Sequence, residues 1–182
     1  MNPSQLSQAV KVLQAGEVIA YPTEAVYGLG CDPFDFAAIT KLFHVKQRPV
    51  EKGVILVAAS IEQVLPYVEL MDTPWQKQVE QTWPGPVTWI LPAKPNVPEW
   101  ITGGRETVAI RVSDHPVVQA LCSAYGKPIV STSANITNQA PAKSCDEIQQ
   151  IFQDKVLCVE GALGNLDKPT QIREAISGKV LR

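Results

Sequence analysis

The chain has 182 residues, 45% of them hydrophobic, and its 16 Lys and Arg residues against 18 Asp and Glu residues give a formal net charge of −2. This length favours one domain over residues 1–182, with a core large enough to fold without a structural metal or disulfide. The slightly acidic balance excludes a globally basic nucleic-acid-binding protein, although it is compatible with a local basic groove.

Helical and strand patterns alternate along most of the chain. Helices are predicted where capping residues precede apolar positions at helical spacing, and strands where short β-branched runs lie between turn residues. In chain order, the first half is expected to form a helix from Ser4 to Gly16, a strand over 18–21, a helix from Asp35, a strand over 53–59, and helices from Ser60 and from Pro74 to Trp83. The second half is expected to form strands over 87–91 and 107–112, a helix from Asp114 to Tyr125, a strand over 129–130, a helix from Ser144, a strand over 156–159 and a hairpin over 171–181.

This alternation predicts the α/β class, with a single open, twisted β-sheet flanked by helices. The closing hairpin and the closely spaced middle strands favour a mixed sheet over a purely parallel one. The apolar runs are far shorter than the roughly 20 residues of a membrane helix, and the N-terminus lacks the charged start and apolar core of a secretory signal. We therefore expect a cytoplasmic protein with no membrane partner.

The four cysteines, Cys31, Cys122, Cys145 and Cys158, are scattered along the chain. They form no Cys-x-x-Cys pair, and only two histidines accompany them. This spacing argues against a zinc site and against a disulfide framework. We expect all four to be isolated small core residues in a reducing cytoplasm.

Three polar segments are candidates for ligand binding. In open α/β sheets, ligands bind beyond the carboxyl ends of strands, and residues 23–30 and 131–138 follow apolar strands and are rich in hydroxyl, amide and glycine groups. The third segment contains four cations and one acid, which are Lys41, Lys46, Arg48, Lys52 and Glu51. An arginine can fork onto phosphate or carboxylate, so this segment points to an anionic ligand, with a solvated charged loop as the alternative.

Single residues and known motifs narrow the chemistry only a little. Arg111 is a charged residue within the apolar strand 107–112. Because an unpaired buried charge is unfavourable, its side chain must either point away from the core or pair with an anion. A nucleophilic serine in residues 131–135 would need a base, but the chain offers only His44 and His115 and lacks Gly-x-Ser-x-Gly. The common nucleotide-binding glycine motifs are absent too. Composition and spacing thus indicate an anion-binding α/β protein and name no reaction.

Five motifs at these same segments match a known family in order and over nearly the whole chain. They are residues 21–30 (YPTEAVYGLG), 46–49 (KQRP), 83–88 (WPGPVT), 108–112 (VAIRV) and 131–135 (STSAN), with weaker matches at 169–172 (PTQI) and 181–182 (LR). With these motifs the chain resembles the YrdC-like family of threonylcarbamoyl-AMP synthases, in its short bacterial form. The resemblance implies a YrdC-like fold with a concave basic groove.

The resemblance implies a nucleotidyltransferase that joins L-threonine, bicarbonate and ATP into threonylcarbamoyl-AMP and pyrophosphate. It implies Mg²⁺ as the counter-ion of ATP, held mainly by phosphates, and it assigns no metal-binding residue. Partner proteins would then pass the threonylcarbamoyl group to adenosine in the anticodon loop of tRNA.

The resemblance also assigns residues to the two substrates. For threonine, it implies contacts from Thr23, Tyr27, Arg111, Ser131 and Thr170. For ATP, it implies contacts from Lys46, Arg48, Lys52, Thr107, Ser133, Asn135 and Arg182. Lys46 and Arg48 are the implied catalytic pair, because they would neutralise the charge that develops as pyrophosphate leaves.

The chain departs from the family pattern at a few positions. Gly53 and Ser113 stand where the family often has proline, and Val57 stands where some relatives have a histidine near threonine. Residues 136–138 (ITN) replace the usual hydrophobic-Ser-Gly. None of these departures removes a catalytic candidate.

An alternative function comes from another class. The protein would be a non-catalytic RNA-binding module of tRNA or ribosome maturation, and it would use the same basic groove. A groove that tracks phosphates would not need Thr23, Arg111 and Ser131 together, so these three residues favour the enzyme. Direct binding of tRNA by the enzyme itself stays open.

Overall fold

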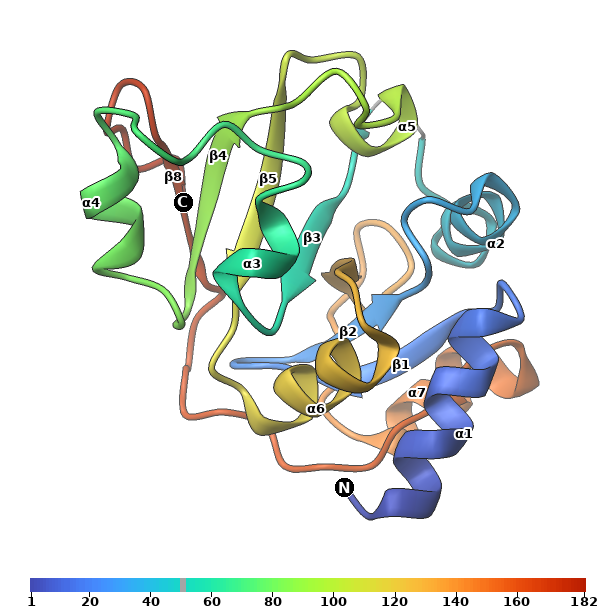
Figure 1. Ribbon diagram of the computed structural model, residues 1–182. Coiled ribbons are helices and arrows are strands. Elements are labelled where there is room, and N and C mark those ends of the chain that lie inside the picture. Colours follow the sequence, from blue (N-terminus) through green and yellow to red (C-terminus); the bar gives the residue numbers. More distant parts are fainter. Residues whose placement is uncertain (50–51) are drawn as a thin grey trace.

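The computed structural model describes residues 1–49 and 52–182 and has the α/β architecture expected from the sequence (Figure 1). Within these residues, one mixed sheet has the strand order β7-β1-β2-β6-β3-β5-β4-β8. The strands are β1 (Ile19–Pro22), β2 (Tyr27–Gly30), β3 (Ile55–Ala58), β4 (Val87–Pro92), β5 (Thr107–Val112), β6 (Ile129–Ser133), β7 (Leu157–Cys158) and β8 (Gln171–Glu174). The helices are α1 (Pro3–Gln14), α2 (Phe36–Lys46), α3 (Ile61–Val64), α4 (Gln76–Glu80), α5 (Glu99–Thr102), α6 (Pro116–Tyr125), α7 (Cys145–Phe152) and the 3₁₀ turn η2 (Gln153–Lys155).

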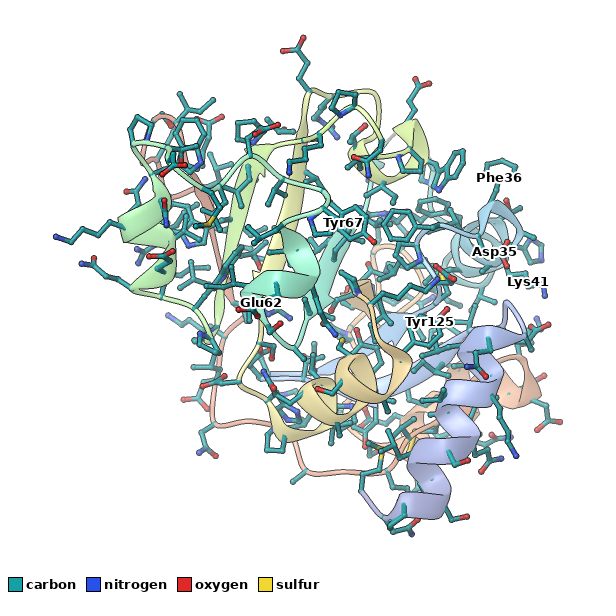
Figure 2. The ribbon with its side chains drawn as sticks, in the orientation of Figure 1. Asp35, Phe36, Lys41, Glu62, Tyr67 and Tyr125 are labelled. Carbon is teal, nitrogen blue, oxygen red and sulfur yellow. A yellow bond between two sulfur atoms is a disulfide. The ribbon has the colours of Figure 1, made fainter. Side chains whose placement is uncertain are left out.

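Capping side chains fix where the longer helices begin. Asn2, rather than Ser4, caps α1, because its side chain accepts a hydrogen bond from the Gln5 amide while the Gln5 side chain accepts one from Asn2 N. Asp35 caps α2 as expected and is labelled at the start of that helix in Figure 2. His115 caps α6 through Nδ1. In the part of the chain that the structure describes, every helix is too short or too polar to cross a bilayer.

Helices pack against both faces of the sheet. On one face, α2, α3 and α7 pack in a cluster with Leu56, Ile110 and Trp89. On the other face, α1 and α6 pack against each other and cover Val57 and Ile129, in the lower part of Figure 1. Each fully buried aliphatic side chain contributes roughly 1.5–3 kcal/mol, so these two layers hold the sheet together.

The second face is only partly covered by α1 and α6. Side chains alternate along a strand, and in β3 both Ile55 and Val57 point to this face. Val57 packs under α6, whereas Ile55 lines a cavity, together with Ala109 of β5 and Ile90 of β4. The cavity therefore lies where the sheet extends beyond the two helices. It also follows that Val57, at the position of the family's occasional histidine, belongs to the core.

Two of the predicted polar loops are shorter than expected, because strands extend into them. Residues 27–30 form β2, which pairs antiparallel with both β1 and β6. Residues 131–133 continue β6. The cross-strand partners satisfy the backbone of these hydroxyl- and glycine-rich stretches, so tertiary pairing overrides their weak strand propensity. The helix expected from Pro74 to Trp83 is also shorter than predicted, because only Gln76–Glu80 form α4.

The expectation that all four cysteines are isolated is wrong. Cys145 at the start of α7 and Cys158 in β7 form a disulfide with Cα atoms 5.8 Å apart, whereas Cys31 and Cys122 are free and buried. The two bonded cysteines are 13 residues apart in sequence, a spacing that carries no recognised signal. They meet because the chain folds back after α7, through η2, into β7.

Removal of this disulfide is expected to lower the free energy of unfolding by about 2 to 4 kcal/mol, because the crosslink restricts the unfolded chain. The measurement is urea denaturation of the protein and of the variant Cys145→Ala/Cys158→Ala. Dithiothreitol should destabilise the parent protein and leave the double variant unchanged. Equal unfolding midpoints for the two proteins would contradict the prediction.

Asp32 joins the end of β2 to the connection between α6 and β6. Its Oδ2 accepts hydrogen bonds from Lys127 Nζ at 2.6 Å and from the hydroxyl of Tyr125, labelled in Figure 2, at 2.7 Å. Burial alone would raise the pKa of this carboxyl, but the hydrogen bonds from Lys127, the backbone and Tyr125, with the Lys127 charge, hold the pKa below its usual range.

A depressed carboxyl pKa gives a stability contribution that is present above the unfolded-state pKa of about 3.9 and is lost as the pH falls through the folded-state pKa. Asp32→Asn is therefore expected to be less stable than the parent at pH 7, with a difference that shrinks below about pH 4. Urea denaturation across this pH range measures it. A difference that is independent of pH would show that the Asp32 charge contributes nothing.

Candidate functional site

A cavity of about 590 Å³ opens on the part of the sheet that α1 and α6 leave uncovered. Its walls come from the β1–β2 loop, residues 52–55, residues 101–109, the end of β6 and residues 169–172. Among the residues predicted from sequence, it is lined by Thr23, Tyr27, Arg48, Lys52, Thr107, Arg111, Ser131, Ser133, Thr170 and Arg182. Lys46 and Asn135 are not among the lining residues.

Arg111 of β5 lines the cavity and is only 4% exposed. Its Nη1 donates hydrogen bonds to the hydroxyls of Thr88 at 3.0 Å and Thr170 at 3.2 Å. Its Nε lies 3.2 Å from Glu24 Oε1, which makes a buried ion pair. Arg111, for which the sequence showed no partner, is therefore paired with Glu24, and its guanidinium is surrounded by hydroxyl groups.

Three residues that carry hydroxyl groups line the same cavity: Thr23 directly after β1, Tyr27 in β2 and Ser131 in β6. At Gly28, a Cβ would lie 3.3 Å from the Thr23 methyl carbon Cγ2, which is a tight contact, and 3.6 Å from Ser131 Oγ, which is an ordinary one. The Tyr27 hydroxyl donates to Gly161 O at 3.1 Å, and burial raises the pKa of Tyr27. Tyr27 is thus a neutral donor that is already fixed in place.

Lys46, the last residue of α2, holds the loop after β6. Its Nζ is within hydrogen-bond distance of Ser133 O, Ser133 Oγ, Asn135 O at 3.1 Å and Asn135 Oδ1 at 2.9 Å. Its own carbonyl oxygen accepts hydrogen bonds from Thr137 N and Oγ1, both at 3.0 Å. Burial lowers the pKa of the Lys46 ammonium to about 8. That Lys46 contacts a phosphate stays a prediction.

Further cations line the cavity, namely Arg48, Lys52, Arg105 and Arg182. Arg48 Nη2 donates to Gly53 O at 3.0 Å, and Arg182 Nε donates to Thr170 O at 3.2 Å. Burial lowers the pKa of both arginines, and for Arg182 the charge of Arg111 adds to the effect. Glu51, the acid of the basic segment, lies outside the described residues.

Gly53 explains one departure from the family pattern. Its φ is +62°, and a Cβ at this position would lie 2.8 Å from Ile101 O. Proline has φ fixed near −65° and cannot adopt this conformation, so the backbone here requires the glycine. The close approach lets Val54 N donate to Ile101 O at 3.0 Å, which joins the basic segment to α5.

Several polar residues of the site were not predicted from the sequence, among them Glu24, Thr88 and Arg105. Glu24 and Thr88 contact Arg111, and Arg105 lines the cavity. A signal existed for two of them, because Glu24 and Thr88 lie inside the motif segments 21–30 and 83–88. A buried arginine needs polar partners, and these motifs were the place to look for them.

The donor set of the site is suited to anions and not to a resident metal. The described lining residues include no Asp or Glu. Within residues 1–49 and 52–182, no three or more His, Cys, Asp or Glu side chains gather in a way that could hold a metal ion. The volume is typical of small-molecule sites, which measure about 300–1,000 Å³.

A family model and individual relatives with known names both match nearly the whole chain. The family model for Sua5, YciO and YrdC proteins, described as "Telomere recombination", matches residues 11–182. The threonylcarbamoyl-AMP synthase of Vibrio parahaemolyticus is 51% identical over 178 residues, covering 96% of each chain. The threonylcarbamoyl-AMP synthase of Yersinia enterocolitica is 48% identical over 184 residues, covering 100% of this chain and 96% of the other.

Solved structures share the fold. The crystal structure of P. abyssi Sua5 complexed with L-threonine is 29% identical with a TM-score of 0.91, covering 100% of this chain and 54% of that one. The crystal structure of E. coli YciO is 29% identical with a TM-score of 0.80, covering 95% of this chain and 85% of that one. The resemblance noted in the sequence motifs is confirmed, and the chain belongs to the Sua5/YciO/YrdC family.

Proposed function

We propose that this protein is a threonylcarbamoyl-AMP synthase, which joins L-threonine, bicarbonate and ATP into threonylcarbamoyl-AMP and pyrophosphate. The observation that carries the proposal is a single cavity that combines a buried arginine among hydroxyl groups with several further cations. Relatives at about half identity over almost their whole length are named for this activity.

Threonine would bind at Arg111. A guanidinium N–H makes a strong, charge-assisted hydrogen bond to a carboxylate. The hydroxyls of Thr88 and Thr170 already occupy Nη1 of this guanidinium, which leaves Nη2 as the donor for the substrate carboxylate. The hydroxyls of Thr23 and Ser131 are in the same cavity and are suited to the substrate's amine and hydroxyl. Tyr27 would form a wall of this subsite.

ATP would bind among the other cations of the cavity. Arg48 and Lys52 are suited to the phosphates, with contacts to the nucleotide from Thr107, Ser133 and Arg182. We assign Lys46 and Asn135 to the same subsite through Ser133, whose position they hold. Because the described lining offers no carboxylate, Mg²⁺ would be held by the phosphates of ATP and would neutralise part of their charge.

The chemistry requires little from the protein beyond placement and charge. Bicarbonate loses hydroxide to give carbon dioxide, to which the threonine amine adds. The amine loses a proton, which leaves with the hydroxide as water, and a carbamate anion results. A carbamate oxygen attacks the α-phosphorus, and the bond to the bridging oxygen breaks as pyrophosphate leaves with the electron pair. Arg48 and its neighbouring cations stabilise the charge that develops on the leaving group. The carbamate is already an anion, so the attack needs no strong general base.

The product would serve tRNA modification in the cytoplasm. Threonylcarbamoyl-AMP is a mixed anhydride that must reach its acceptor before hydrolysis, so partner proteins would transfer its acyl group to adenosine in the anticodon loop. Direct contact with tRNA is the remaining part of this proposal. It predicts tRNA affinity that falls steeply with salt concentration, and a flat salt profile would contradict it.

The test of the proposed function is pyrophosphate release by the purified protein. Release should require ATP, L-threonine and bicarbonate together, and should fall to background when any one is omitted. L-Serine in place of L-threonine is a control for recognition of the side-chain methyl group. ATP turnover that is indifferent to threonine would overturn the assignment and favour a non-catalytic role.

A further inference from the structure

A buried carboxylate lies next to the cavity without being part of its lining. Glu24 follows Thr23 in the β1–β2 loop, and its side chain is only 6% exposed. Thr23 and Arg111 line the cavity, but Glu24 does not. An ionised carboxylate at this depth is unfavourable unless it is paired and hydrogen-bonded. Its partners therefore indicate what it does.

The Glu24 side chain contacts two residues, Ser113 and Arg111, both through Oε1. Oε1 accepts a hydrogen bond from Ser113 Oγ at 2.7 Å and lies 3.2 Å from Arg111 Nε, at ion-pair distance but outside hydrogen-bond geometry. Ser113 Oγ in turn accepts a hydrogen bond from His115 N at 3.1 Å. Ser113 is one of the departures from the family pattern, and here its hydroxyl fixes the carboxylate.

The backbone of Glu24 is fixed from the opposite side by residues 159–170, which run from β7 to β8. Gly164 N donates to Thr23 O at 2.9 Å, and Leu166 N donates to Glu24 O at 3.1 Å. A Cβ at position 164 would lie 2.7 Å from Glu24 Cα, so only glycine permits this contact. Glu24 is thus held in one position by both its backbone and its side chain.

Arg111 is held on two sides of its guanidinium. The Glu24 carboxylate lies at Nε, and the hydroxyls of Thr88 and Thr170 occupy Nη1. None of the hydrogen bonds among the described residues uses Nη2 of Arg111. A guanidinium restrained at Nε and Nη1 has its plane defined, and an Nη2 group placed in advance loses less entropy when it meets a carboxylate.

We propose that Glu24 is a positioning residue: its carboxylate sets the orientation of Arg111 and through it the affinity for the carboxylate of the amino-acid substrate. The inference rests on the proposed function, in which that substrate is threonine. Glu24 also balances the Arg111 charge when the site holds no substrate, so the arginine need not turn away from the cavity to find another oxygen.

The test compares Glu24→Gln with the parent protein in the pyrophosphate assay. Glu24→Gln removes the charge of the buried ion pair with Arg111, so the KM for threonine should rise by roughly 10- to 100-fold, which corresponds to about 1.4 to 2.8 kcal/mol, while the KM for ATP changes by less than about threefold. The control is Asp32→Asn, which removes a half-buried carboxylate that is paired with the cation Lys127 away from the cavity. Asp32→Asn should leave both KM values unchanged.

A substrate without a carboxylate separates a positioning role from a merely structural one. The parent should prefer L-threonine to L-threonine amide in kcat/KM, and Glu24→Gln should reduce that preference. Arg111→Lys should raise the KM for threonine in the parent and have a much smaller effect in the Glu24→Gln background, because both changes act on one contact. Equal increases in both KM values with an unchanged preference would overturn the inference.

Two other outcomes are also decisive. If Glu24→Gln does not fold, Ser113→Ala removes one hydrogen bond from the same carboxylate and should raise the KM for threonine selectively, and an unchanged KM overturns the inference. A parent protein with threonine-dependent turnover and a Glu24→Gln variant with parental KM values overturn the inference alone. A parent without threonine-dependent turnover overturns the proposed function and the inference with it.

Discussion

Lys46→Ala is expected to lose both activity and stability. Lys46 is 3% exposed, and its ammonium donates hydrogen bonds to oxygens of Ser133 and Asn135. Its removal leaves buried acceptors without a donor, at about 1 to 3 kcal/mol in the free energy of unfolding. It also releases the loop that places Ser133 in the cavity. Loss of charge stabilisation at the leaving group should reduce transition-state stabilisation, measured from kcat/KM, by about 2 to 4 kcal/mol.

Two matched variants separate these effects. Lys46→Met keeps most of the length of the side chain and removes the charge, so it should reproduce the loss of activity with less loss of packing. Arg48→Ala removes a cation that lines the cavity and makes one hydrogen bond to Gly53. It should lower kcat/KM by a similar factor and change the urea midpoint only slightly. Parental rates in both variants would refute a role for this basic segment at the phosphates.

Arg111→Ala is expected to be the most destabilising single change in the cavity. It removes the cation beside Glu24 and leaves a buried carboxylate unpaired. Breaking a buried ion pair from one side typically destabilises a protein by about 3 to 5 kcal/mol. The variant should also lose threonine-dependent pyrophosphate release, because the substrate carboxylate loses its partner. Urea denaturation and the pyrophosphate assay measure the two effects.

Restoration by a second change identifies the cause of the instability. In the double variant Arg111→Ala/Glu24→Gln, the unpaired charge is gone, so part of the lost stability should return although activity stays low. If the double variant is no more stable than Arg111→Ala, the instability comes from lost packing of the arginine and not from the buried charge.

Local signals in the sequence were sufficient for several elements. The strand over 107–112 has the predicted bounds, and α2 begins at its expected capping residue, Asp35. The helix expected from Asp114 begins one residue later, with His115 as its cap. These features depend on residues close together in the chain: β-branched runs, side chains that cap nearby amides and glycine at helix ends. The family motifs likewise selected a set of residues of which most line one cavity.

The contacts between distant segments had no such local signal. Cys145 and Cys158 pair because the chain folds back after α7, and β2 takes residues expected in a loop because β1 and β6 lie on either side. The oxygens that surround Lys46 lie about 90 positions further along the chain. The sequence therefore identified Lys46 as a candidate cation but did not indicate its hydrogen-bond partners.

The sequence by itself thus determined the α/β class, the family and the pool of polar residues available to the site. Only the tertiary structure decided which of them share a surface, which are buried behind it and which charges neutralise each other. The reason is physical: helix caps and apolar periodicity act within a few residues, whereas burial and ion pairing depend on what the whole fold brings within a few ångströms. Glu24 and Arg111, 87 positions apart in the sequence and 3.2 Å apart in space, show the difference.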